Sequence, residues 1–311
     1  MTNPNLPIIE ITDLRKYFKE VKAVDGVTFS VREGELFAFL GENGAGKSTT
    51  ISVISGDLKK DSGSVKISGY DLDDDLEKIK PLLGIVFQTS VLDKPLSVYD
   101  NLKNRASLYG IVGTEFENRF QELSLLLELE EIKNRPLSKL SGGQKRRVDI
   151  ARAIIHKPKI LILDEPTTGL DPMTRKKVWD VVDGLRKELK MTVFLTTHYM
   201  EEASMADYIV IIDKGIIAEK GTPLELKNKY TKDAIYVYNA SEEDIKGLGF
   251  EYEKIKNGFK ILVKDTKTAQ ELILKNPSVF NDFEIVKGKM DDVFLAVTGK
   301  KIGDKENENG I

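Results

Sequence analysis

The stretch Gly41-Glu42-Asn43-Gly44-Ala45-Gly46-Lys47-Ser48-Thr49 decides the fold of this chain. It matches G-x-x-x-x-G-K-[ST], a pattern whose backbone N–H groups surround the phosphates of a nucleotide. The apolar run 36–40 before it indicates a buried strand, and residues 48–54 after it indicate the first turns of a helix. The sequence therefore predicts a phosphate-binding loop, with Lys47 on the β- and γ-phosphates and Ser48 on Mg²⁺.

A second motif, Leu-Ser-Gly-Gly-Gln at 140–144, precedes apolar residues at near-helical spacing over 148–155. Ser141 is a suitable N-cap residue, and the glycines Gly142 and Gly143 leave the start of the helix without side chains. A bare helix N-terminus attracts anions. Alone the motif would be a common loop, but beside a phosphate loop it indicates a second phosphate contact.

The third motif is a buried strand, 160–163, that ends in Asp164 and Glu165. Open α/β sheets place their chemistry at the carboxyl ends of parallel strands. Asp164 offers the hard oxygen ligand that Mg²⁺ prefers. Glu165 is the candidate general base that would polarise an attacking water.

In their order and spacing, these motifs resemble the nucleotide-binding subunit of ATP-binding cassette (ABC) transporters over about residues 8–225. The resemblance implies an α/β P-loop fold with an inserted helical subdomain at about 89–139, which binds and hydrolyses ATP with Mg²⁺. It assigns catalytic roles to Lys47, Glu165 and His198, and Mg²⁺ contacts to Ser48, Gln88 and Asp164. It also implies nucleotide contacts from Gly41, Glu42, Asn43, Gly44, Ala45, Gly46, Lys47, Ser48, Thr49, Gln88, Ser141, Gly142, Gly143, Gln144 and Asp171.

An aromatic ring should stack on the adenine base through its π-face. In the L-x-K-x-aromatic pattern of the resembled family, Leu14 and Lys16 point to Phe18. Tyr17, one residue earlier, is the alternative, and either ring could instead belong to the core.

The composition agrees with an ATPase of this kind. A net charge of -3 argues against a nucleic-acid-binding protein. The absence of cysteine excludes disulfides and zinc–thiolate sites and is compatible with a reducing cytoplasm. No apolar run is long enough to span a membrane, and residues 1–10 lack the pattern of a signal peptide.

The pattern of strands and helices predicts two domains. The first, 1–230, holds the cassette motifs and includes a helix over 178–189 and a strand over 193–197. The second, 231–299, is predicted as a small α+β domain, followed by a polar tail at 300–311 that we expect to be disordered. Its ending, Met290-Asp291-Asp292-Val293-Phe294-Leu295-Ala296-Val297-Thr298-Gly299, resembles that of daunorubicin-resistance-type cassettes, which serve exporters with a separate membrane subunit.

Each motif occurs once, so one chain supplies one cassette. The resemblance implies a homodimer whose ATP-driven closure powers an integral membrane permease at the cytoplasmic face of the cell membrane. One alternative is a soluble ABC ATPase of translation or DNA repair, although those usually carry paired cassettes or long coiled coils. A P-loop GTPase or kinase is disfavoured, because it would lack the 140–144 motif and because 228–231 fails the Asn-Lys-x-Asp guanine pattern. The transported substrate is not encoded in these motifs.

Overall fold

The computed structural model describes residues 7–299. Its contacts divide the chain into two units, Met1–Ala218 and Glu219–Ile311. This division lies ahead of residue 230, the boundary that the sequence predicts, and helix α8 (Pro223–Tyr230) packs against α11 (Met290–Thr298) within the second unit. The predicted disordered tail, 300–311, lies outside the described residues.

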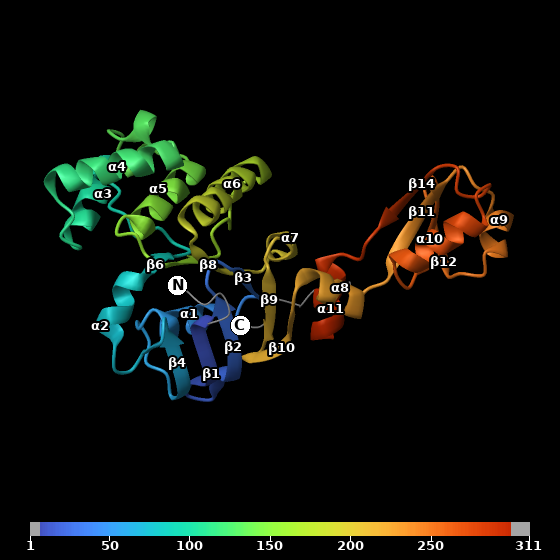
Figure 1. The fold of residues 1–311 in the computed structure, drawn as a ribbon, viewed down its shortest axis with the longest axis horizontal. Helices are drawn as coiled ribbons and strands as arrows, with labels where there is room; N and C mark the ends of the chain where they lie inside the picture. The colour runs from blue at the N-terminus through green and yellow to red at the C-terminus, as the bar shows by residue number, and fades with distance from the viewer. Residues whose placement is uncertain (1–6, 300–311) are drawn as a thin grey trace, which may run out of the picture. The chain divides into compact units, whose positions relative to one another are not determined.

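The first unit is built around a six-stranded sheet in the order β10-β9-β3-β8-β7-β6 (Figure 1). Strand β3 pairs in parallel with β8 and β9, and β7 pairs in parallel with β6 and β8. Both faces of β3 are buried, as a central parallel strand requires. The strands are β3 (Leu36–Leu40), β6 (Leu83–Val86), β7 (Ile160–Asp164), β8 (Thr192–Thr197), β9 (Tyr208–Asp213) and β10 (Ile216–Gly221).

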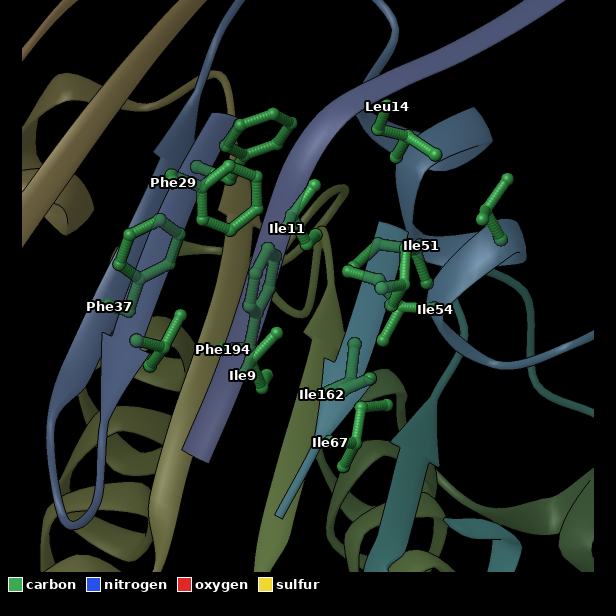
Figure 2. Packing of buried hydrophobic residues seen from close by; sticks show 14 of the residues in the cluster. Ile9, Ile11, Leu14, Phe29, Phe37, Ile51, Ile54, Ile67, Ile162 and Phe194 are labelled. Carbon is green, nitrogen blue, oxygen red and sulfur yellow. The ribbon is translucent and has the colours of Figure 1, made fainter. Parts of the chain in front are cut away.

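A second, antiparallel sheet of the same unit has the order β2-β1-β4-β5. Its strands are β1 (Pro7–Phe18), β2 (Val21–Arg32), β4 (Ser62–Ile67) and β5 (Tyr70–Asp71). The two sheets share one core, in which Phe29 of β2 stacks on Phe37 of β3 with ring centroids 5.1 Å apart, and Phe37 meets Phe194 of β8 at 4.9 Å. Figure 2 shows these rings together with Ile51 and Ile54 of helix α1 (Lys47–Ile54), which belong to the same core. The core thus holds both elements that flank the phosphate loop.

Three of the remaining helices of this unit, α3 (Val98–Ser107), α4 (Gly113–Leu127) and α5 (Gly142–Ile154), lie between β6 and β7 in the chain. The others are α2 (Leu76–Ile79), α6 (Pro172–Leu189) and α7 (Met200–Ala203), and short 3-10 turns lie at Lys80–Leu82, Glu130–Ile132 and Leu137–Lys139. Helices α3 and α4 lie in the predicted helical region, 89–139, where Phe116 is buried against Tyr99 and Phe120. Within residues 7–299, none of the helices has both the length and the apolar character needed to cross a membrane.

The second unit contains an antiparallel sheet in the order β12-β13-β11-β14. Alternate residues of β11 and β13, among them Ile235, Val237, Phe259 and Ile261, form a core with helices α9 and α10. These elements are β11 (Asp233–Tyr238), α9 (Glu242–Gly247), β12 (Tyr252–Ile255), β13 (Gly258–Val263), α10 (Thr266–Lys275) and β14 (Phe283–Val286).

Candidate functional site

The loop between β3 and α1 requires glycine at two positions. Gly46 has φ 111°, and a Cβ there would lie 2.4 Å from the carbonyl oxygen of Ala23. A Cβ on Gly41 would lie 2.6 Å from the carbonyl oxygen of Ile212. Gly46 is also the N-cap residue of α1 and brings no side chain to that end. The first turn of α1 can therefore present its backbone N–H groups to an anion.

Lys47 occupies the first position of α1 and is only 4% exposed. Its Nζ donates hydrogen bonds to the carbonyl oxygens of Gly41 at 2.8 Å and Glu42 at 2.9 Å, across the loop. The same atom lies 3.3 Å from Oε1 of Glu165, which follows strand β7. The ammonium group thus connects the glycine-rich loop with the acidic end of a neighbouring strand.

The carboxylate of Glu165 is the meeting point of the predicted site residues. Its Oε2 accepts hydrogen bonds from Nε2 of Gln88 and from the hydroxyl of Thr168, each at 3.1 Å, and lies 3.3 Å from Nδ1 of His198. Burial would raise the pKa of Glu165, but the charge of Lys47 and the contact with His198 outweigh it and hold that pKa below its usual value. The group is therefore poised as a carboxylate that can accept a proton.

Asp164 ends strand β7 one residue earlier and accepts a hydrogen bond from the Thr196 hydroxyl of β8. Burial raises its pKa above the usual value, and the Thr196 hydrogen bond offsets this only in part. Residues 7–299 contain no cluster of three or more His, Cys, Asp or Glu side chains that could hold a metal. The oxygen donors of Ser48, Gln88 and Asp164 nevertheless fit Mg²⁺, which commonly binds through few protein ligands together with substrate phosphates.

A pocket of about 590 Å³ opens over the loop and the helix start. Part of its wall comes from residues outside the predicted motifs. These are Val21, Lys22 and Ala23 of strand β2, and Lys214 of the turn after β9. Its lining consists of Val21, Lys22, Ala23, Asn43, Gly44, Gly46, Lys47, Ser48, Thr49, Gln88, Glu165 and Lys214. Most of the predicted phosphate-loop residues thus share one pocket with Gln88 and Glu165.

Phe18 and Tyr17, the two candidates for stacking on the adenine base, do not line this pocket. The Phe18 side chain is 46% exposed, with the Lys16 ammonium 5.5 Å from its ring centroid. The Tyr17 hydroxyl donates a hydrogen bond to Asp25 at 2.6 Å. The exposed ring of Phe18 keeps it the better candidate, and the assignment stays a prediction.

Residues 140–144, the signature motif of this chain, lie at the start of helix α5 (the signature helix) and do not line that pocket. Ser141 caps helix α5 as predicted: its hydroxyl accepts from the Gln144 N–H at 3.3 Å, and its N–H donates to the Gln144 side chain at 3.0 Å. A Cβ on Gly143 would lie 2.4 Å from the Thr174 side chain, so this helix start packs closely on the start of α6. None of the described residues that line the 590 Å³ pocket belongs to 140–144.

Asp171 has a local role in the structure, as the N-cap residue of α6. Its carboxylate accepts hydrogen bonds from the backbone N–H of Thr174, at 3.0 Å, and from the Thr174 hydroxyl. The nucleotide contact that the resemblance implies for Asp171 stays a prediction.

Three further residues support the site and escaped the sequence analysis. Thr168 and Thr196 donate to the two acidic residues, and Arg146 of α5 donates to the backbone carbonyl of Glu165. The threonines lie next to predicted motifs, so their proximity was a usable signal. Arg146 follows the signature in sequence, but nothing in its pattern indicates a contact with β7.

Comparison with known proteins agrees with this geometry. Residues 24–168 match the model of the ABC transporter family. The chain is 39% identical to the linearmycin resistance ATP-binding protein of Bacillus subtilis, covering 73% of each chain. It is 32% identical to the daunorubicin/doxorubicin resistance ATP-binding protein of Streptomyces peucetius, covering 96% of this chain and 95% of the relative. The dimeric structure of a bacterial ABC transporter cassette superimposes with a TM-score of 0.63 at 30% identity, over 69% of this chain and 98% of that one.

Proposed function

Because the chain belongs to the family of ABC transporter ATP-binding proteins, whose cassettes bind and hydrolyse ATP, we propose that it is the ATP-hydrolysing subunit of a membrane exporter. The observation that carries this proposal is the convergence of Lys47, Gln88 and His198 on the Glu165 carboxylate, at the wall of the loop pocket. A phosphate-binding lysine, a carboxylate base and their orienting partners are the parts that phosphoryl transfer to water needs.

In the proposed reaction, the Lys47 ammonium exchanges its contact with Glu165 for the β- and γ-phosphates of ATP. Glu165 then accepts a proton from water as the water oxygen bonds to the γ-phosphorus and the bond to the bridging oxygen breaks, giving ADP and phosphate. His198 contacts a γ-phosphate oxygen, and Gln88 and Thr168 orient the carboxylate. Mg²⁺, held by Ser48, Gln88 and Asp164, would neutralise charge on the phosphates.

The separation of residues 140–144 from the loop pocket supports a site completed by a second chain. In this proposal two copies meet head to tail, and the N-terminus of α5 of one copy contacts the γ-phosphate held by the other. ATP favours the closed pair because its γ-phosphate adds contacts there, and hydrolysis removes them. The related cassette that is dimeric in its solved structure supports this arrangement.

The membrane partner is proposed from the relatives. Among them are a Nod factor export protein and two drug-resistance proteins, each named as an ATP-binding protein. We expect this chain to bind an integral membrane permease through the surface near Gln88 and 89–139, at the cytoplasmic face of the cell membrane. The second unit, whose residues 231–299 we predict to form an α+β domain, would serve dimer stability, regulation or assembly with the permease.

Replacement of the base tests the chemistry directly. Glu165→Gln keeps the size and shape of the side chain and one acceptor oxygen but cannot take a proton, so turnover should fall by roughly 10²–10⁴-fold while Mg·ATP still binds. The variant should accumulate as an ATP-bound dimer in size-exclusion chromatography. Glu201→Gln, at an exposed glutamate of α7, is the matched control. Normal hydrolysis by Glu165→Gln would assign the base to another residue.

Complementation tests the shared site. Gly142→Asp places a carboxylate at the N-terminus of α5, where repulsion of a γ-phosphate costs on the order of a few kcal/mol. A mixture of Gly142→Asp with Lys47→Ala chains should recover part of the hydrolysis, because a head-to-tail heterodimer has one unaltered site. Gly142→Ala controls for packing, since its Cβ would lie 3.1 Å from Leu170. Normal hydrolysis by Gly142→Asp alone would refute the role of the signature.

A further inference from the structure

One arginine connects three parts of the site that the chain keeps far apart in sequence. Arg146 lies in the first turns of α5 and is 7% exposed. Its Nη1 donates to the carbonyl oxygen of Phe87 at 2.7 Å, and its Nη2 donates to the carbonyl oxygens of Gln88 and Glu165, each at 3.3 Å. All three acceptors are backbone carbonyls, so the guanidinium fixes the backbone of these segments and contacts none of their side chains through these bonds.

We propose that Arg146 is a positioning residue for ATP hydrolysis, which fixes the Gln88 backbone and the Glu165 backbone to the signature helix through one guanidinium group. The proposal rests on the proposed function, because it assigns how that site is assembled. With both carbonyls held by one planar group, the side chains of Gln88 and Glu165 meet at 3.1 Å. A displacement of α5 would therefore also displace Glu165, the candidate base.

The backbone at Glu165 explains why such a clamp is needed. Glu165 has φ 44°, in the left-handed region that is uncommon for residues other than glycine. A strained conformation of this kind persists only where its surroundings hold it from several sides. Strand β8 accepts the Glu165 N–H through the Thr196 carbonyl at 3.1 Å, and Arg146 holds the carbonyl side.

The shape of the guanidinium, and not only its charge, carries this role. Arginine presents several N–H donors in a rigid plane, whereas lysine is a compact point charge on a flexible stem. Arg146→Lys therefore keeps the positive charge but offers one nitrogen in place of two, so it cannot hold the Phe87 carbonyl together with those of Gln88 and Glu165 in the same geometry. Arg152 is a matched control on the same helix: it is 8% exposed and donates to the Ile85 carbonyl of β6 at 2.7 Å.

The experiment compares Arg146→Lys, Arg146→Gln and Arg152→Lys in the full chain. Equilibrium dialysis gives the Kd for Mg·ATP, phosphate release gives kcat and KM, and thermal unfolding monitors the fold. We expect kcat of Arg146→Lys to fall by about 10- to 100-fold, since small misplacements of reacting groups have effects of this size. Its Kd and its thermal unfolding should match those of Arg152→Lys, whose kcat should stay near that of the wild type.

A double-mutant cycle isolates the route of the effect. If Arg146 acts through Gln88, the loss of kcat in Arg146→Lys and Gln88→Ala combined should be smaller than the product of the separate losses. Arg152→Lys and Gln88→Ala should combine independently.

Equal kcat in Arg146→Lys and Arg152→Lys would overturn the inference. Failure of both Arg146 variants to fold, while Arg152→Lys folds, would also overturn it, because Arg146 would then serve the fold alone. A wild-type chain that binds no ATP and releases no phosphate would instead refute the proposed function, and the inference with it.

Discussion

Replacement of Lys47 by methionine separates the phosphate charge from the fold. Methionine has a stem of similar length, so Lys47→Met removes the ammonium group and keeps most of the buried volume. The group that is lost donates to the Gly41 and Glu42 carbonyls and lies 3.3 Å from Glu165. Without that charge, burial should raise the pKa of Glu165.

The magnitudes follow from these contacts. The Glu42 carbonyl keeps the Ala45 N–H as a donor, at 3.2 Å, so the change mainly removes the hydrogen bond to the Gly41 carbonyl. Losing that bond costs about 1–3 kcal/mol of folding stability, which is less than the roughly 5–15 kcal/mol that stabilises an ordinary protein. The variant should therefore fold. A hydrogen bond from a charged group to phosphate contributes about 1.5–3 kcal/mol, so the affinity for Mg·ATP should fall by about 10- to 150-fold, and turnover should be lost at any ATP concentration.

Isothermal titration calorimetry and phosphate release measure the two effects, and circular dichroism checks the fold. Lys22→Met is the matched control, because Lys22 lines the same pocket but pairs with Asp25 at 3.1 Å and is exposed. Its effect on turnover should be small. Wild-type turnover in a folded Lys47→Met chain, or an equal loss in Lys22→Met, would refute the assignment of Lys47 to the phosphates.

Four other changes test the fold and the extent of the site. Burial lowers the pKa of His156 to about 4, below its ordinary value of 6.5. The stability that depends on a neutral His156 is therefore complete above pH 6.5 and is lost as the pH falls toward 4. In urea titrations His156→Gln should reduce the fall of the free energy of unfolding between pH 6.5 and 4, and an unchanged pH dependence would contradict this. Gly184→Ala, within helix α6, should raise the free energy of unfolding by about 0.5–1 kcal/mol, since outside the helix's own backbone and the neighbouring residues no described atom lies within 4 Å of the added Cβ. Gly46→Ala should instead abolish ATP binding, because its Cβ would meet a carbonyl oxygen at 2.4 Å. A chain ending after Gly221 should bind ATP like the full chain, because Lys214 is the last residue along the chain that lines the pocket. Loss of binding in a folded fragment would show that the second unit contributes to the site.

Much of the local structure was predictable because its causes are local. The apolar runs before Gly41 and Asp164 predict the strands that the structure contains, since buried parallel strands need continuous apolar residues. Ser141 was identified as an N-cap from its own hydroxyl and the glycines that follow it. Helix α6 begins at Pro172, ahead of the predicted 178, because Asp171 caps it and proline suits the first turn.

The sequence was less able to predict to which unit a helix belongs. Helix α8 shows the same helical pattern whichever unit it packs against, so its periodicity could not place the boundary. The lining of the pocket by Lys22 and Lys214 was likewise invisible, because lysines in turns and strands usually face solvent.

The sequence by itself therefore determined the phosphate loop, the acidic strand end and the start of the signature helix, because each depends on neighbouring residues with distinctive side chains. Only the tertiary structure decided that Lys47, Gln88 and His198 converge on Glu165, and that Arg146 holds two of these segments together. The physical reason is that the acceptors of Arg146 are backbone carbonyls. Every residue carries one, so a sequence gives no sign of which carbonyl a distant side chain will reach.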